Sequence, residues 1–171
     1  MRPALALAAL ALAGCADSVR VFNASPIPQH RADISRAATG GIQALEVHGA
    51  PPDGAAPEAV AAATTGPAGF RPTRYALAAP GEGGLRTVFE FGGAAGGQAS
   101  CRAPRGSAQA PGADMQIAAT LCQGSGDVST ATLRAPGVAG PSSPGYEAAV
   151  RALLRELLTP ERPQMFPRFL R

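Results

Sequence analysis

Lysine and tryptophan are absent from this 171-residue chain, and aromatic residues make up only 5% of it. The lack of Lys excludes catalysis by a Ser–Lys pair and Schiff-base chemistry. All 15 basic residues are therefore Arg, and together with 12 acidic residues they give a formal net charge of +3. Because this surplus is small and scattered along the chain, it gives no reason to expect a nucleic-acid partner.

Long regular segments are also scarce, because Gly and Pro contribute 21 and 17 residues. This share lies below the level that marks disordered chains, yet it is high for a compact domain. Together with the few aromatic residues, it predicts a modest hydrophobic core, long connections and a dependence on covalent support.

The apolar run near the amino terminus, Ala4–Ala13, contains only Ala and Leu and follows a single charge, Arg2. As a helix the run would rise about 15 Å. The hydrocarbon core of a bilayer is about 30 Å thick, so the run cannot span it. Its length and flanks are typical of an export signal.

The sequence Leu12-Ala13-Gly14-Cys15 closely resembles the lipobox of bacterial lipoproteins. That resemblance implies cleavage after Gly14, a diacylglycerol thioether on the Cys15 sulfur, and a further acyl chain such as palmitate on the new amino terminus. Two or three chains hold a soluble domain on a membrane almost permanently, at roughly 0.8 kcal/mol per buried methylene. The alternative is an ordinary signal peptide whose cleavage site happens to precede a Cys.

The residue after the lipidated Cys sorts many lipoproteins between the two bacterial membranes, and Asp there favours retention in the inner membrane. Ala16 stands at that position, and Asp17 comes one residue later. By the same resemblance, we expect a protein anchored in the outer membrane, in preference to the inner one, and facing the periplasm.

Two thiols, Cys101 and Cys122, remain once Cys15 carries lipid, and an even number in an oxidising compartment favours a disulfide. The bridge would close a loop of about 22 residues and contribute roughly 3 kcal/mol. Redox pairs usually have C-x-x-C spacing, and zinc requires further Cys or His ligands that are not nearby. We predict a structural disulfide and no metal or other cofactor.

The chain divides into a signal peptide (1–14), the lipidated Cys with a flexible tether (15–40), and a folded domain (41–171). Pro26 and Pro28 break regular structure in the tether. Its predicted span of roughly 25–30 Å would hold the domain clear of lipid head groups. We expect an α+β domain: a small, largely antiparallel sheet with one short and one longer helix packed on one face.

Turn residues and apolar alternation predict a strand at 42–47 and two hairpins, 73–79 with 85–91 and 115–122 with 128–135. In strand 85–91, Phe89 and Phe91 are expected to face the core, and Arg86, Val88 and Glu90 to face outward. A short helix is predicted to open at 57–58 and stop at 66–67.

The longer helix is predicted over 144–158, with Ser143 as its N-cap. A stripe at helical spacing is expected to pack on the sheet: Tyr146, Val150, Leu153, Leu154, Leu157 and Leu158. The roles of the irregular segment 92–113 and of the apolar tail 165–171 stay open, although for the tail we favour folding back on the domain.

No motif for chemistry is specific. The Gly-rich run 92–97 lacks the Lys-Ser/Thr and the helix of a phosphate loop. Neither His30 nor His48 has a second His, Cys or carboxylate at i, i+4, a spacing that binds metals on helices. An enzyme would need a site assembled from distant residues such as His48, Asp114 and Asp127.

Three functional hypotheses follow. The leading one is a non-catalytic accessory protein, anchored through its lipid and binding another protein or lipid of the cell envelope. The second is a small periplasmic hydrolase that uses His48, Asp114 and Asp127. The third is a purely structural envelope lipoprotein without a specific ligand. The likeness of this layout to small periplasmic lipoproteins is an analogy of fold alone.

Overall fold

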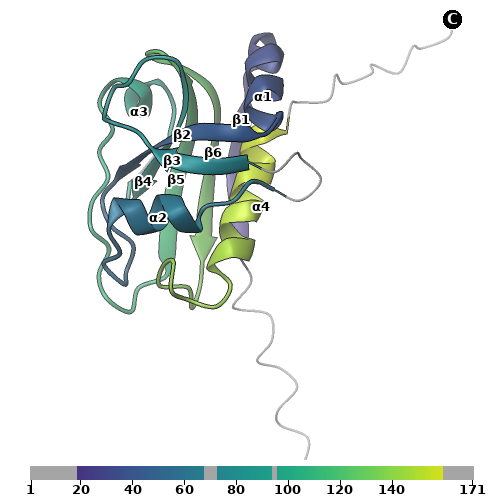
Figure 1. Cartoon of the computed structure of the whole chain (residues 1–171). Coiled ribbons are helices and arrows are strands. Elements are labelled where there is room, and N and C mark those ends of the chain that lie inside the picture. Colours follow the sequence, from purple (N-terminus) through teal and green to yellow (C-terminus); the bar gives the residue numbers. More distant parts are fainter. Residues whose placement is uncertain (1–18, 68–72, 94–95, 160–171) are drawn as a thin grey trace, which may run out of the picture.

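In the part of the chain that the structure describes, six strands form one mixed sheet in the order β1-β6-β5-β4-β2-β3 (Figure 1). The structure is a computed structural model that describes residues 19–67, 73–93 and 96–159. The pairings from β1 through β6 and β5 to β4 are antiparallel, and β2 pairs in parallel with both β4 and β3. The strands are β1 (Arg20–Pro26), β2 (Gly41–His48), β3 (Thr73–Leu77), β4 (Leu85–Phe91), β5 (Met115–Gln123) and β6 (Gly126–Ala135).

Within the described residues, four α-helices accompany the sheet, which confirms the α+β class. They are α1 (Arg31–Ala38), α2 (Pro57–Ala63), α3 (Gln98–Arg102) and α4 (Tyr146–Leu158), and a 3-10 turn at Pro28–His30 precedes α1. Buried residues of α1, α2 and α4 join one large core cluster with Phe89 and Phe91 of β4. Val88, the residue before Phe89, instead packs with the α3 residue Cys101. Because alternate strand residues face opposite ways, α3 covers the other side of the sheet.

The second predicted hairpin is confirmed, since β5 and β6 pair antiparallel from Met115–Ala135 to Gln123–Gly126. The prediction of the first hairpin, 73–79 with 85–91, is wrong. Strands β3 and β4 do not pair with each other but lie on either side of β2, parallel to it. The connection between them must therefore cross β2, and the Gly-rich turn at 81–84 that suggested a hairpin serves this crossing instead.

The prediction of a tether is wrong for residues 20–38, which belong to the folded domain. Strand β1 pairs with β6, and Ile34 and Ala37 of α1 are buried in the core. Pro26 is compatible with a strand because β1 lies at the sheet edge, where a missing N–H donor is tolerated. Pro28 begins the 3-10 turn. Residues 1–18, with the predicted signal peptide and Cys15, lie outside the described residues.

Helix α4 confirms the predicted stripe, because all six of its residues are at most 1% exposed. Its N-cap differs from the prediction. The cap residue is Gly145, at φ +89°, and no side chain caps the helix. The Ser143 hydroxyl instead accepts a hydrogen bond from the Ala139 amide at 3.0 Å, so it fixes the loop before the helix.

The two tyrosines of the chain, Tyr75 and Tyr146, are both buried in the core. Burial raises the pKa of Tyr146 to about 12 and that of Tyr75 well above its usual 10. A raised tyrosine pKa stabilises the fold below pH 10, and this contribution is lost as the pH rises towards the pKa of the tyrosine in the folded protein.

Because Trp is absent, phenolate absorbance should report these two residues alone. We expect it to appear only well above pH 10, together with unfolding seen by circular dichroism. Ionisation with an ordinary midpoint in folded protein would contradict this burial.

No helix in the described ranges has the length and apolar character needed to cross a membrane. The apolar tail 165–171, for which folding back was favoured, lies outside these ranges. Segment 92–113, expected to be irregular, contains α3.

Candidate functional site

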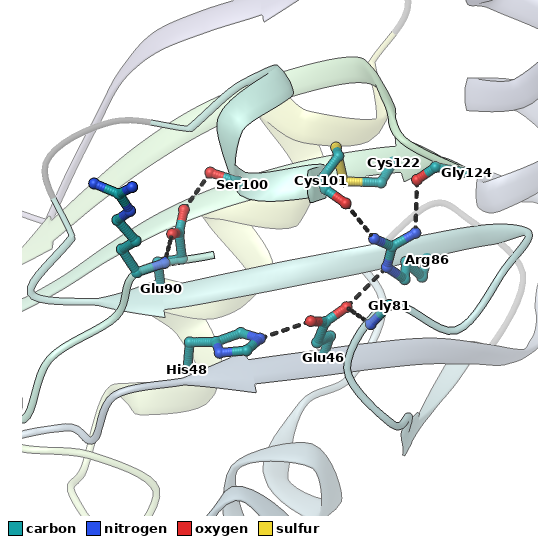
Figure 2. A network of polar contacts seen from close by, with 10 residues as sticks. Glu46, His48, Gly81, Arg86, Glu90, Ser100, Cys101, Cys122 and Gly124 are labelled. Atoms are coloured by element: carbon teal, nitrogen blue, oxygen red, sulfur yellow. Dashed lines mark hydrogen bonds and ion pairs between the residues drawn. A yellow bond between two sulfur atoms is a disulfide. The ribbon is translucent and has the colours of Figure 1, made fainter. Parts of the chain in front are cut away.

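A buried polar network occupies the side of the sheet that α3 covers (Figure 2). Strands β2 and β4 pair in register, with Ala44 beside Arg86 and His48 beside Glu90. Glu46, which lies between these positions on β2, therefore shares a face with the two charged residues of β4. The alternation of β4 was predicted correctly, but Arg86 and Glu90 are not outward residues exposed to solvent. They are 2% and 4% exposed.

Glu46 is the centre of this network and is only 1% exposed. One carboxylate oxygen, Oε2, accepts hydrogen bonds from Arg86 Nε at 2.8 Å and from the Gly81 amide at 3.3 Å. The other, Oε1, lies 2.7 Å from His48 Nε2. Gly81 belongs to the connection that crosses β2, so this buried carboxylate holds the crossing in place.

Arg86 links the network to α3 and to the β5–β6 turn. Its two terminal nitrogens donate to the carbonyl oxygens of Gly124, at 2.8 Å, and Cys101, at 2.7 Å. Cys101 forms a disulfide with Cys122, as predicted, and their Cα atoms are 5.6 Å apart. Since Cys122 is the cross-strand neighbour of Arg86, the disulfide fixes α3 directly over the guanidinium group.

Glu90 attaches the same covering segment at a second point. Its carboxylate accepts a hydrogen bond from the Ser100 hydroxyl of α3 and another from the Arg105 amide. Farther along, the Ser107 amide donates to the Phe91 carbonyl, and Ser107 in turn accepts from Ala50. Segment 96–109 is thus held to β4 and to the end of β2 by backbone and carboxylate contacts.

The pKa of Glu46 results from two opposing effects. Burial raises it, but hydrogen bonds from His48, Arg86 and Gly81 together outweigh burial and hold the pKa below 4.5. A carboxyl group with a lowered pKa stabilises the fold at pH values above its pKa in the unfolded chain. That contribution is lost as the pH falls through its pKa in the folded protein.

We expect the urea midpoint of the wild type to decrease as the pH falls below about 4.5. Glu46→Gln should make this decrease shallower, and an unchanged slope would contradict the assignment.

The Glu46–His48 pair has one of the contacts that acid–base catalysis uses, a carboxylate that orients an imidazole ring, but the contacts below pair no nucleophile with the ring. A buried carboxylate orients one ring nitrogen, and the His48 side chain is 21% exposed, which lets the ring reach solvent. The buried hydroxyl of this region, on Ser100, is bonded to Glu90. The geometry described by these contacts is therefore that of a structural clamp: it fastens α3, the crossing connection and β2 to one another.

The three residues proposed for a hydrolase do not come together. Asp114 directly precedes β5 and forms an ion pair with Arg134 at 2.8 Å, whereas Asp127 lies beside Cys122, near the other end of β5. Seven residues of strand separate these ends by about 23 Å. His48 contacts Glu46, so this set forms no catalytic site. Within the described ranges, no group of three or more His, Cys, Asp or Glu residues could hold a metal ion.

A shallow depression of about 490 Å³ lies beside the start of α4. Of its polar residues, Thr65 donates a hydrogen bond to Glu147 at 3.2 Å, and Glu147 also pairs with Arg151. The lining residues are Ala62, Ala63, Thr65, Pro141, Ser143, Pro144, Gly145, Tyr146 and Glu147. These groups do not define a ligand class.

The buried network was missed from sequence because its cover, α3, follows β4 and could not be placed without the strand order. One signal was present: the predicted disulfide would bring the segment around Cys101 onto the strand that carries Cys122.

Comparison of the chain with protein-family models, with curated proteins and with solved structures finds no significant match.

Proposed function

We propose that this chain is a lipoprotein of the outer membrane, anchored through acyl chains on Cys15 and facing the periplasm. The observation that carries the proposal is the pairing of cysteines. The disulfide joins Cys101 to Cys122, so of three cysteines only Cys15 is left outside it. That residue ends the lipobox-like sequence Leu12-Ala13-Gly14-Cys15. A disulfide of this kind also suits the oxidising periplasm.

Cys15→Ser tests the anchor. The wild-type protein should fractionate with membranes and be released only by detergent, since two or more acyl chains anchor a protein stably. Its intact mass should show loss of residues 1–14 and addition of the lipid. The variant should lack the added mass and move to the soluble fraction. An unmodified thiol on the mature protein, or equal membrane retention of the variant, would refute the anchor.

We further propose that the anchored domain is an accessory protein that binds another component of the envelope. Support comes from exposed apolar side chains away from β1: Ile42 of β2 is 76% exposed and Leu77 of β3 is 41% exposed. The two side chains lie on opposite faces of this edge of the sheet, because Leu77 pairs with Leu45, three residues from Ile42; each is therefore a separate candidate point of contact.

A photo-crosslinking residue at Ile42, introduced in intact cells, tests this role. One adduct of defined mass is expected there, and none when the same group replaces Arg36, whose side chain is 64% exposed on α1. Absence of any protein or lipid adduct at Ile42 and Leu77 would favour the structural alternative.

A further inference from the structure

The connection between the proposed anchor and the folded sheet is very short. Only residues 16–18 separate Cys15 from Val19, the first described residue, and β1 begins at Arg20. Four fully extended residues span at most about 14 Å. Because β1 is paired with β6 from Arg20 onward, this length is a covalent limit on how far the domain can stand from Cys15.

This limit is similar to the thickness of the lipid head groups. The polar layer on each side of a bilayer is about 5–8 Å thick, and the lipidated sulfur of Cys15 would lie near its base. Val19 would then lie within about 10 Å of the outer surface of the head groups. The domain cannot stand clear of the membrane, as a tether ending at residue 40 would have allowed.

The surface at this end of β1 suits contact with lipid. Val19 and Phe22 are large apolar residues that are 39% and 45% exposed. Arg20 is exposed and lies beside Arg134 in the ladder. Asp114 neutralises part of the charge of Arg134, so Arg20 supplies most of the attraction for phosphate groups. At physiological salt, screening allows such attraction over about 8 Å.

We propose that this end of the sheet, formed by Val19, Arg20, Phe22 and Arg134, rests on the phosphate-bearing head groups of the membrane that holds Cys15. The proposal depends on lipidation of Cys15. It orients the domain, because Ile42 lies at the opposite end of the sheet. Phe22 and His48 lie in one row across the strands, four strand spacings or about 19 Å apart. Ile42 precedes His48 by six residues on β2, which is about 20 Å along the strand, so Ile42 lies about 28 Å from Phe22.

A single tryptophan can measure this orientation, because the chain has none of its own. The acylated protein is placed in vesicles of phosphatidylethanolamine and phosphatidylglycerol that contain lipids spin-labelled on the head group. The quenching of Phe22→Trp fluorescence is compared with that of Ile42→Trp. Both positions are exposed, so neither substitution disturbs the core. We expect Phe22→Trp to be quenched at least twofold more strongly.

A second variant tests the short connection itself. Insertion of a long Gly-Ser segment between Ser18 and Val19 should reduce the quenching of Phe22→Trp by at least half, while the lipid mass stays unchanged. Equal quenching at both positions in acylated, vesicle-bound protein would overturn the orientation and leave the anchor intact. Quenching that is unaffected by the insertion would overturn the role of the short connection. Absence of lipid mass would instead refute the anchor.

Discussion

Replacing Cys101 and Cys122 by Ala is expected to lower the free energy of unfolding by about 3 kcal/mol. The disulfide joins residues 21 positions apart, and its loss restores the conformational entropy of that loop in the unfolded chain. Cys101 and Cys122 also form a small buried cluster with Val88. Urea unfolding of the soluble Cys15→Ser form, followed by circular dichroism, measures the change.

Reduction of the unmodified disulfide provides the control for this substitution. With a thiol reductant the parent protein should approach the stability of the Ala pair, whereas the Ala pair should not respond. A loss below about 1 kcal/mol would mean that α3 is held mainly by Arg86 and Glu90, and the covalent support predicted from composition would be unnecessary.

Arg86→Met is expected to cost about 3–5 kcal/mol, the largest loss for any single substitution discussed. The change removes the guanidinium that neutralises Glu46 and leaves a buried carboxylate without its cation. It also removes the donors to Gly124 and Cys101. Without Arg86, the pKa of Glu46 should rise, so the variant should bind a proton on Glu46 at a higher pH than the wild type.

Arg134→Met is the matched control, because its ion pair with Asp114 is solvent-exposed and such pairs contribute at most about 1 kcal/mol. The double variant Glu46→Gln, Arg86→Met should recover part of the loss, since no buried charge remains. Equal effects of Arg86→Met and Arg134→Met in urea unfolding would show that the buried pair is not the clamp described above.

Local sequence patterns predicted those elements whose partners are adjacent in the chain. The β5–β6 hairpin has a two-residue turn between long apolar strands, and α4 carries an apolar stripe that needs no knowledge of its neighbours. The disulfide followed from counting cysteines. In each case the information lies within about 25 residues, which is the range over which turn chemistry and periodicity act.

Pairings between strands that are far apart in the sequence could not be predicted in this way. Strand β2 pairs with β4 about 40 residues later, and nothing in Pro80–Gly84 distinguishes a crossing from a hairpin. Strand β1 depends on β6, more than 100 residues away, whereas the local signals, Pro26 and Pro28, indicate an irregular segment. The burial of Glu46 and Arg86 likewise depends on a cover that only the complete strand order reveals.

The pairing of β1 with β6 also constrains biogenesis. A chain threaded through a translocation channel delivers β1 first, but its hydrogen-bonding neighbour arrives only when the segment up to Ala135 has followed. The leucines of α4 emerge later still. Until then the edge of the nascent sheet is open. If the chain is exported and acylated on Cys15 as proposed, it must therefore complete its folding after export, with its first strand already held at the lipid surface.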